Sequence, residues 1–300
     1  MEVQLNVQTN STVRKRINWY LWGTLFVIPE IILFFIFLWV PIVKGIVYSF
    51  YNVDFMDGNT FVGFENYLSI FHDSLFWISI KNTFYYMFLG IVFGFWVPPL
   101  IAISVSELKW FQGFARIVGY LPSAVPAIVL YGMWMWFFDP VGPINKFLTN
   151  VGLSKIEFFS PHMAMVSIVL METWQNFGSA TLIYIAAIVS IPKDHYEAAE
   201  IDGAGVWQRI RYITLPSIKT QMALLLMLQV IATSQGFQAQ LQMTDGGPNN
   251  ATLTYLLWLN HTAFQQFEFG KASTMGSIMF FFLVFLSIIY NLLQRRSDAA

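Results

Sequence analysis

Two stretches of the chain place amide, hydroxyl and carboxylate side chains inside otherwise apolar sequence. The first, ETWQNFGS, runs from Glu172 to Ser179 and mixes hydrogen-bonding groups with two aromatic rings. The second has spacings of four, three and four residues, which predict one face of a helix, and its members are Gln229, Thr233, Gly236 and Gln240. Amides and carboxylates hydrogen-bond hydroxyl groups, and aromatic rings supply apolar faces for sugar C–H groups. The residue types therefore predict a polar path that suits a carbohydrate.

Two carboxylates within apolar sequence allow a different chemistry. Glu30 directly follows Pro29, and Glu172 opens the first polar stretch. Ionisable groups inside a membrane are costly, so each is a candidate functional group, and a proton relay would use such acids. A proton-coupled secondary sugar transporter is therefore an alternative, although the two halves of the chain show no internal repeat of the kind that such transporters carry. Glu30 is expected to pair with a neighbouring helix or to stay protonated, and its role stays open.

The sequence lacks the residues that several other classes of chemistry require. The chain has no cysteine, and its four histidines share no metal-ligand spacing. It has no G-x-x-x-x-G-K-[ST] phosphate loop, so it is not expected to hydrolyse ATP by that chemistry. We predict no catalytic residue, no metal site and no cofactor bound by this chain.

The apolar background of these residues indicates a membrane protein. Charged residues make up 11% and hydrophobic residues 56% of the 300, whereas soluble domains average about 25% charged residues. A hydrocarbon core about 30 Å thick needs roughly 20 apolar residues per helix. Such windows are expected at about 18–43, 82–106, 115–138, 163–190, 217–241 and 272–293. We predict an all-α integral membrane protein with six transmembrane helices and a single domain over residues 1–300. The formal net charge of −1 argues against nucleic-acid binding.

Basic residues are distributed unevenly between the segments that join these windows. With a cytoplasmic N-terminus, eleven of the 16 Lys and Arg residues fall on the inner side and five on the outer side, and every arginine is inside. An excess of Lys and Arg marks cytoplasmic loops. Both termini are therefore predicted to be cytoplasmic, and segment 191–216 becomes the one sizeable cytoplasmic loop.

The cytoplasmic loop is predicted to form two short helices. Pro192 and Asp194 favour a helix start, because a missing N–H costs nothing in the first turn and the acid faces the positive end of the helix dipole. Gly203 and Gly205 end this helix, and a second is expected over 206–212. Such a pair of short helices would lie either on lipid headgroups or against a protein partner. Small alanines flanked by acids favour a protein groove, because interfacial helices prefer basic and bulky apolar residues.

Three groups of residues in this loop carry a family resemblance. Glu197-Ala198-Ala199, Asp202-Gly203-Ala204 and Ile213-Thr214-Leu215-Pro216 resemble the EAA loop of bacterial ABC-importer permeases, at the spacing of that family. The resemblance implies a coupling helix that docks on a separate ATP-binding subunit. The implied ATPase-coupling residues are Tyr196, Glu197, Ala198, Ala199, Asp202, Gly203 and Ala204. The chain departs from the family at Thr220, where a proline is frequent, which leaves the local entry into the fifth span open.

Outer-loop sequence narrows the resemblance to the carbohydrate class. Thr244-Asp245-Gly246-Gly247-Pro248, followed by Ala251-Thr252, resembles the T-x-G-G-P loop of permeases similar to the maltose permease subunits. Further matches are Val62-Gly63-Phe64-Glu65-Asn66-Tyr67, Asn82-Thr83, Leu121-Pro122, Asp139-Pro140 and Asn145. The resemblance therefore covers nearly the whole chain.

Counting from the EAA loop and from Gly-Gly-Pro, the maltose-type pattern implies a sugar site within the membrane. The matching positions are Glu172, Gln175, Asn176, Ser179, Thr233, Gln235 and Gly236. In importers with two different permeases, one subunit sometimes holds the ligand while its sister does not, and polar residues also bridge helices. Sugar contact and helix bridging therefore stay open as alternatives for this set.

The resemblance implies the ABC-importer permease fold and a function. The chain would be the permease subunit of an ATP-driven, binding-protein-dependent importer of an oligosaccharide or related carbohydrate, working by alternating access in the bacterial cytoplasmic membrane. Implied partners are a second homologous permease in a heterodimer, two ATP-binding subunits that carry ATP and Mg, an extracytoplasmic solute-binding protein, the carbohydrate and the lipid bilayer. The alternatives are an ABC importer of a non-sugar solute, the proton-coupled transporter and a membrane scaffold without transport.

Overall fold

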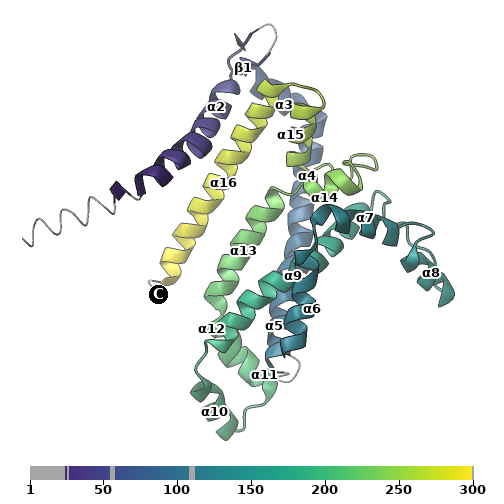
Figure 1. The fold of residues 1–300 in the computed structure, drawn as a ribbon, viewed down its shortest axis with the longest axis vertical. Helices are drawn as coiled ribbons and strands as arrows, with labels where there is room; N and C mark the ends of the chain where they lie inside the picture. Colours follow the sequence, from purple (N-terminus) through teal and green to yellow (C-terminus); the bar gives the residue numbers. More distant parts are fainter. Residues whose placement is uncertain (1–23, 26, 55–57, 108–111, 299–300) are drawn as a thin grey trace, which may run out of the picture. The chain divides into compact units, whose positions relative to one another are not determined.

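The computed structural model describes residues 24–298 apart from 26, 55–57 and 108–111, and the side chains of 112, 114–116 and 293–298 also lie outside the description. The expected first span, 18–43, therefore begins outside the described residues. Within the described range the chain is largely helical, with a single two-stranded sheet (Figure 1). Its contacts divide into two compact units, which we describe separately. A single permease domain over residues 1–300 stays a prediction.

The first unit consists of the chain through Ser69 together with Phe267–Phe282. Its elements are the π-helical segment η1 (Phe35–Trp39), α2 (Val40–Tyr48), β1 (Tyr51–Asn52), β2 (Thr60–Phe61), the start of α3 (Glu65–His72) and the first half of α16 (Phe269–Asp298). The strands pair antiparallel, with Tyr51 opposite Phe61. The helix α2 is apolar apart from Lys44 and has no buried residue, as a helix in contact with lipid would.

Side chains of the first unit secure the turn that follows α2. The Asn66 Nδ2 group donates hydrogen bonds to the Ser49 and Tyr51 carbonyl oxygens, each at 3.0 Å. The Thr274 hydroxyl donates to the Ser49 carbonyl at 3.0 Å. Gly270 lies so close to the Tyr51 carbonyl that a side chain there would collide with it. The Val62–Tyr67 motif thus has a structural role as a clamp on this turn.

The second unit consists of Ile70–Gln266 and the residues from Leu283 onward, and it carries most of the helices. Its first helices are α4 (Ser74–Leu89), η2 (Gly90–Phe95), α5 (Val97–Glu107), α6 (Gln112–Ala124), α7 (Ala127–Phe137), α8 (Pro143–Asn150) and α9 (Ala164–Val189). They are followed by α10 (Lys193–Ile201), α11 (Val206–Arg209), η4 (Ile210–Thr214), α12 (Leu215–Ser217), α13 (Lys219–Ser234), α14 (Gln238–Met243) and α15 (Tyr255–Phe264). The long helix α9 packs against both α5 and α6.

Within the described residues, three helical stretches are long and apolar enough to cross a membrane: Val27–Tyr48, Ser74–Glu107 and Phe269–Leu292. Three further helix pairs meet the same length and composition test if each bent pair counts as one span, which gives up to six. The expectation of six spans agrees with the upper figure. The second span is longer than predicted, because its helix begins at Ser74 and not near residue 82.

The third expected span, 115–138, is two helices that meet at an angle. Segments Ile117–Ala124 and Ala127–Phe137 are bent by 102°. Pro126 precedes α7 with an extended backbone, φ −55° and ψ 131°. A proline lacks the N–H that a continuous helix needs and disfavours helical geometry in the residue before it. The expected span is therefore interrupted at this proline.

The fifth expected span, 217–241, is also interrupted. The helix α13 ends at Ser234, and α14 begins only at Gln238. The Gly236 carbonyl accepts a hydrogen bond of 2.9 Å from the Thr254 hydroxyl, and the Tyr86 ring occupies the space where a side chain at position 236 would lie. The predicted helical face therefore breaks at Gly236, and Gln240 is fully buried in α14.

Glycines allow close helix contacts in the second unit. A Cβ atom at Gly90 would lie 2.6 Å from Thr233 Cγ2, and one at Gly94 would lie 2.8 Å from Gln229 Nε2. Gly178 of α9 lies against the Gly119 backbone of α6 with no space for a side chain. Small residues permit this approach of helix backbones in membrane proteins. The glycines thus bring η2 against α13 and α6 against α9.

Motif residues of the outer loops form braces within the second unit. The Asn82 Nδ2 group donates to the Asn250 and Leu253 carbonyls at 2.6 and 3.0 Å. The Thr83 hydroxyl accepts the Tyr255 N–H at 2.9 Å. Asn145, which is fully buried, pairs through both ends of its amide with the backbone of Ile156, at 3.0 and 2.8 Å. These bonds hold loops that have no regular secondary structure.

The Gly-Gly-Pro loop has its own hydrogen bonds. Thr244 and Thr252 join through their hydroxyls at 2.7 Å, and the Thr252 hydroxyl also donates to the Gly247 carbonyl at 2.9 Å. Gly246 has φ +83°, which favours glycine. The motif therefore specifies a tight turn.

Candidate functional site

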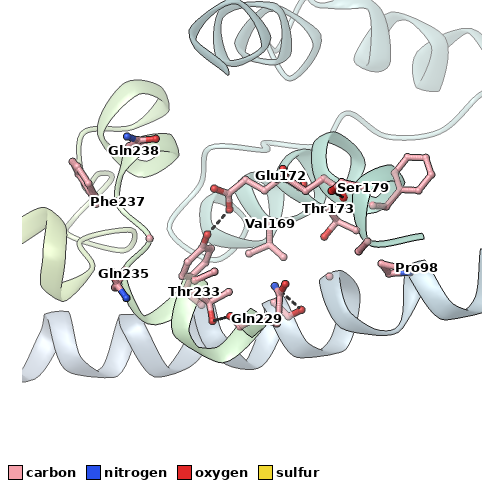
Figure 2. Close-up of a pocket in the computed structure, with 18 of the residues that line it drawn as sticks. Pro98, Val169, Glu172, Thr173, Ser179, Gln229, Thr233, Gln235, Phe237 and Gln238 are labelled. Carbon is pink, nitrogen blue, oxygen red and sulfur yellow. Dashed lines mark hydrogen bonds between the residues drawn. The ribbon is translucent and has the colours of Figure 1, made fainter. Parts of the chain in front are cut away.

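A polar cavity of about 560 Å³ lies between the end of α4, the middle of α9 and the end of α13. Its volume falls within the roughly 300–1,000 Å³ of small-molecule sites. Figure 2 shows Glu172, Thr173 and Ser179 along one wall, with Gln229, Thr233 and Gln235 facing them from the α13 side. The interruption between α13 and α14 lies on this wall, so irregular backbone borders the cavity, as is typical of membrane transport sites.

The structure brings together most of the side chains that the sequence assigned to substrate. The predicted residues that line the cavity are Glu172, Asn176, Ser179, Thr233, Gln235 and Gly236. Gln175 is buried in α9 and is not among the lining residues. Gly236 is held against the Tyr86 ring, so its lack of a side chain positions that ring. Substrate contact by the set stays a prediction.

Three of the polar side chains on the cavity wall have hydrogen-bond partners within their own helices. The Asn176 Nδ2 group donates to the Glu172 carbonyl at 2.9 Å, and the Ser179 hydroxyl donates to the Asn176 carbonyl at 2.9 Å. The Thr233 hydroxyl donates to the Gln229 carbonyl at 2.8 Å. Side-chain oxygens of these residues keep lone pairs that can accept hydrogen bonds from a solute. The wall therefore offers mainly acceptors to a hydroxyl-bearing ligand.

The lining residues outside the predicted set include two tyrosines, Tyr86 and Tyr131. The Tyr86 hydroxyl donates a hydrogen bond of 2.5 Å to Glu172 Oε2 and thereby fixes the carboxylate at the cavity wall. A tyrosine in an apolar helix gives no local signal of such a role. Gly90 lies one helical turn after Tyr86 and packs closely against Thr233 of α13. This close contact places the end of α4 at the cavity wall.

The segment that resembles the EAA loop folds as α10 followed by α11, η4 and α12, and we call Lys193–Ser217 the EAA hairpin. The helix α10 begins after Pro192, which has extended geometry. It ends in a turn where Gly203 has φ +77° and the Ala204 N–H donates to the Ala199 carbonyl at 2.8 Å. The helix start and the glycine end agree with the sequence prediction.

The EAA hairpin has an exposed side and a packed side. The exposed coupling candidates are Glu197, Ala198, Asp202 and Gly203, and the half-buried ones are Tyr196, Ala199 and Ala204. The Tyr196 hydroxyl bonds the buried Thr214 hydroxyl at 2.9 Å. Of the predicted set, Tyr196 thus faces the chain itself, whereas Glu197 and Asp202 face outward. ATPase coupling by these residues stays a prediction.

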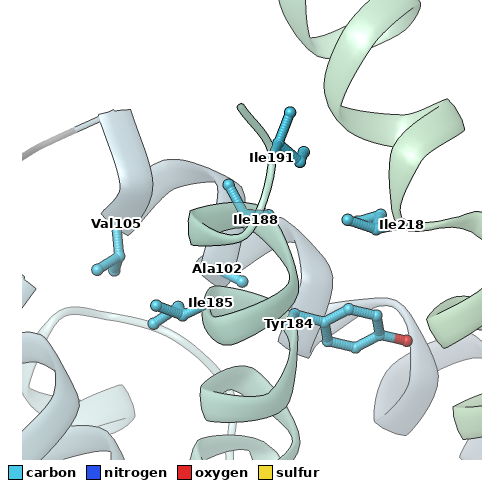
Figure 3. Packing of buried hydrophobic residues seen from close by; sticks show 7 residues of the cluster. All are labelled: Ala102, Val105, Tyr184, Ile185, Ile188, Ile191 and Ile218. Carbon is cyan, nitrogen blue, oxygen red and sulfur yellow. The ribbon is translucent and has the colours of Figure 1, made fainter. Parts of the chain in front are cut away.

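A buried apolar cluster lies beneath the hairpin. Figure 3 shows its members, which are Ala102, Val105, Tyr184, Ile185, Ile188, Ile191 and Ile218. They come from α5, the last turns of α9, the connection between α9 and α10, and the residue that precedes α13, and Tyr196 packs against them. Fully buried side chains of this kind transmit displacement because packed interiors are nearly incompressible.

Arg209 joins the hairpin to the end of α5. Its guanidinium pairs with the Glu200 carboxylate and lies 3.5 Å from Glu107 Oε2. The Arg209 side chain is only 14% exposed, so it also packs as an apolar stem. Glu200 belongs to α10 and Glu107 to α5, so the arginine ties the hairpin to α5 in addition to the flanking helices α9 and α13.

Comparison with known families decides the identity of this architecture. Residues 90–299 match the family described as binding-protein-dependent transport system inner membrane component. The chain belongs to this family. The matched segment contains the whole EAA hairpin and all described cavity residues except Tyr86. The chain is therefore a permease subunit, and permease subunits of ABC transporters are not themselves enzymes.

Two curated relatives of this permease cover nearly its full length. The probable starch degradation products transport system permease protein AmyD of Thermoanaerobacterium thermosulfurigenes is 28% identical over 278 residues, 93% of this chain and 95% of the relative. The probable ABC transporter permease protein YesP of Bacillus subtilis is 32% identical over 282 residues, 92% of this chain and 90% of the relative. The resemblance stated from sequence is confirmed.

Solved structures similar to this permease include a bacterial ABC transporter that imports the acidic polysaccharide alginate. The likeness has a TM-score of 0.82 at 26% identity and covers 94% of this chain and 96% of the other. A second structure of an alginate transporter, in complex with an alginate pentasaccharide-bound periplasmic protein, has a TM-score of 0.83. The prediction of an all-α ABC-importer permease fold is confirmed.

Proposed function

We propose that this permease subunit imports a carbohydrate and that the cavity between α4, α9 and α13 is its path. The cavity combines one carboxylate, several amide and hydroxyl groups and the rings of Tyr86, Tyr131 and Phe177. Such a lining suits a solute with hydroxyl groups and apolar C–H faces. The names of AmyD and of the alginate importer, which refer to saccharides, support the same substrate class.

The observation that carries the proposal is that two helices of the cavity wall lead directly into and out of the EAA hairpin. The helix α9 bears Glu172, Asn176 and Ser179 on the cavity wall and ends directly before α10. The helix α13 bears Thr233 and begins directly after α12. Movement of the hairpin would therefore move two walls of the cavity through the cluster around Ile188 and Ile218.

The mechanism that follows is alternating access driven by ATP. Two ATP-binding subunits, which carry ATP and Mg, close and displace the hairpin, and the cavity then opens outward to receive the carbohydrate from a solute-binding protein. A second homologous permease completes the path as a heterodimer. Both termini and the hairpin lie on the cytoplasmic side in this account. Because both partners act on one conformational equilibrium, a loaded binding protein outside must also bias ATP hydrolysis inside.

Reconstitution tests the proposal. The permease, its sister and the ATP-binding subunits are placed in proteoliposomes with the solute-binding protein, and saccharide uptake is measured with and without ATP. We expect ATP-dependent uptake that falls roughly tenfold in Asn176→Leu, because a hydrogen-bonding group leaves the cavity wall. Asn150→Leu, the same change at an exposed position outside the cavity, is the matched control. Uptake unaffected by Asn176→Leu would contradict the proposed path.

The Tyr86–Glu172 pair in the cavity supports a second candidate, proton-coupled transport, since a carboxylate within the path is the group that a proton relay needs. In that case a pH gradient would drive uptake into liposomes that contain this chain without ATP-binding subunits. The same reconstitution decides between the two, because only one of the driving forces is present in each sample. Uptake with a pH gradient and no ATPase would replace the ATP-driven account.

A further inference from the structure

The cavity is electrostatically one-sided. Among the described residues that line it, the ionisable side chains are Glu172 and the phenols of Tyr86 and Tyr131, and none is Lys, Arg or His. The rest of the lining is amide, hydroxyl, aromatic or small apolar. A charge on a solute in this half of the path would therefore meet one fixed carboxylate and no fixed cation.

One oxygen of the Glu172 carboxyl group has a partner within the protein. The Tyr86 hydroxyl donates to Oε2 at 2.5 Å. No hydrogen bond to Oε1 is found from the described residues. The nearby Asn176 and Ser179 donors turn to backbone carbonyls of α9 instead. The second carboxylate oxygen is thus left to accept a hydroxyl group of a solute.

We propose that Glu172 acts as a charge filter, so that this permease passes uncharged saccharides and rejects saccharides that carry a carboxylate or sulfonate. The inference rests on the proposed function of the cavity as a carbohydrate path and adds the charge class of the carbohydrate. Like charges repel strongly in a partly dehydrated site. A carboxylate on the cavity wall would therefore lower the affinity for an anionic saccharide more than for a neutral one. The permease would then differ in charge preference from the alginate importer, whose polysaccharide is acidic.

Binding measurements on the purified importer without its solute-binding protein isolate the selectivity of the permease itself. The probes are neutral di- and trisaccharides built on glucose, galactose and mannose, each paired with the same saccharide oxidised to a uronic acid at one C6. We expect the wild-type complex to bind the neutral member of a pair at least roughly tenfold more tightly. Glu172→Gln keeps the shape and the acceptor for Tyr86, and it should bring the two affinities within about threefold of each other.

Two further variants keep this test independent of a change in folding. Gln238→Glu adds a second carboxylate of the same shape at an exposed position on the cavity wall and should widen the difference between neutral and acidic probes. Glu157→Gln removes an exposed carboxylate outside the cavity and should leave the ratio of affinities at its wild-type value.

The outcomes separate this inference from the proposed function. If saccharides bind but the acidic member of each pair binds as tightly as the neutral one, the charge filter is refuted and the carbohydrate path stands. An unchanged ratio in Glu172→Gln refutes the filter in the same way. If no saccharide of the panel binds to the wild type or to any variant, the carbohydrate function fails and the inference fails with it.

Discussion

The EAA hairpin and the cavity are built in opposite ways. The hairpin is one continuous segment, Lys193–Ser217, with exposed acids on one side and an arginine held between two carboxylates. The cavity is assembled from helices far apart in the sequence, and its described lining has a single carboxylate and no cation. A surface that meets a protein partner benefits from exposed charges. A path for a hydroxyl-bearing solute benefits from acceptors that do not hold it by charge.

The two regions are connected by the cluster around Ile188, Ile191 and Ile218. Because the packed side of the hairpin lies on this cluster, changes to the exposed side should alter coupling and leave the cavity intact. Changes to the cavity wall should alter solute binding and leave the hairpin intact. The variants below test this separation, from the largest expected effect to the smallest.

Gly178→Ala should have the largest effect, because a methyl group at this position would collide with the Gly119 backbone where α9 crosses α6. Collision with a backbone forces the helices apart, and we expect a loss of more than about 4 kcal/mol in the free energy of unfolding. Thermal unfolding of the purified protein measures it. Gly132→Ala is the matched control, since its added Cβ would have open space. Equal stability of both variants would contradict the close crossing.

Tyr86→Phe should destabilise the cavity by about 1.5 kcal/mol, because the hydrogen bond between the Tyr86 hydroxyl and Glu172 is lost. The released Glu172 side chain should also discriminate less between neutral and acidic saccharides. Thermal unfolding and saccharide binding measure the two effects. Tyr85→Phe, at the neighbouring exposed position, serves as the control. If Tyr86→Phe and Tyr85→Phe agree in both measurements, the Tyr86–Glu172 hydrogen bond has no role in stability or selectivity.

Arg209→Ala should weaken the hairpin by about 1 kcal/mol, the upper range for partly exposed ion pairs, with some loss of packing by the arginine stem. A double-mutant cycle with Glu107→Ala isolates the link between the hairpin and α5. Arg211→Ala provides the comparison, because Arg211 is exposed on the same segment. A coupling free energy of zero in the cycle would remove Arg209 as a tie between these elements.

Tyr196→Phe should have the smallest effect, about 0.5 kcal/mol, because one neutral hydrogen bond to Thr214 is lost while the ring keeps its packing. Thermal unfolding measures it, against Tyr212→Phe at an exposed position of the same hairpin. Saccharide affinity of the cavity should not change. A large loss of saccharide binding would mean that the two regions are not separable.

Local signals in the sequence were sufficient for the hairpin and for α9. Pro192 and Gly203 are helix start and stop signals that act within a few residues, so the start and end of α10 follow from the sequence. The apolar window 163–190 differs by one residue at each end from the observed Ala164–Val189. The six cavity residues named from sequence line the same cavity because they belong to only two segments, α9 and the end of α13 with the two residues that follow it.

The missed features depend on contacts between distant segments. The end of α13 at Ser234 reflects the Thr254 hydroxyl and the Tyr86 ring, which lie far from it in the sequence. Tyr86 itself belongs to an apolar helix, and only folding brings its hydroxyl to Glu172. Gln175 was assigned to the substrate from spacing in a motif, but its direction on α9 turns it away from the cavity. Periodicity cannot report any of these contacts.

The central claim is that ATP hydrolysis reaches the cavity through the exposed side of the EAA hairpin. The most direct test is Glu197→Lys in the reconstituted importer, with ATP hydrolysis stimulated by the saccharide-loaded solute-binding protein and saccharide binding to the permease measured in parallel. Reversal of an exposed charge at a protein interface should lower the stimulated hydrolysis roughly tenfold or more while binding to the cavity is unchanged. Glu157→Lys, an exposed acid outside the hairpin, should behave as the wild type. Normal stimulated hydrolysis in Glu197→Lys would contradict the account.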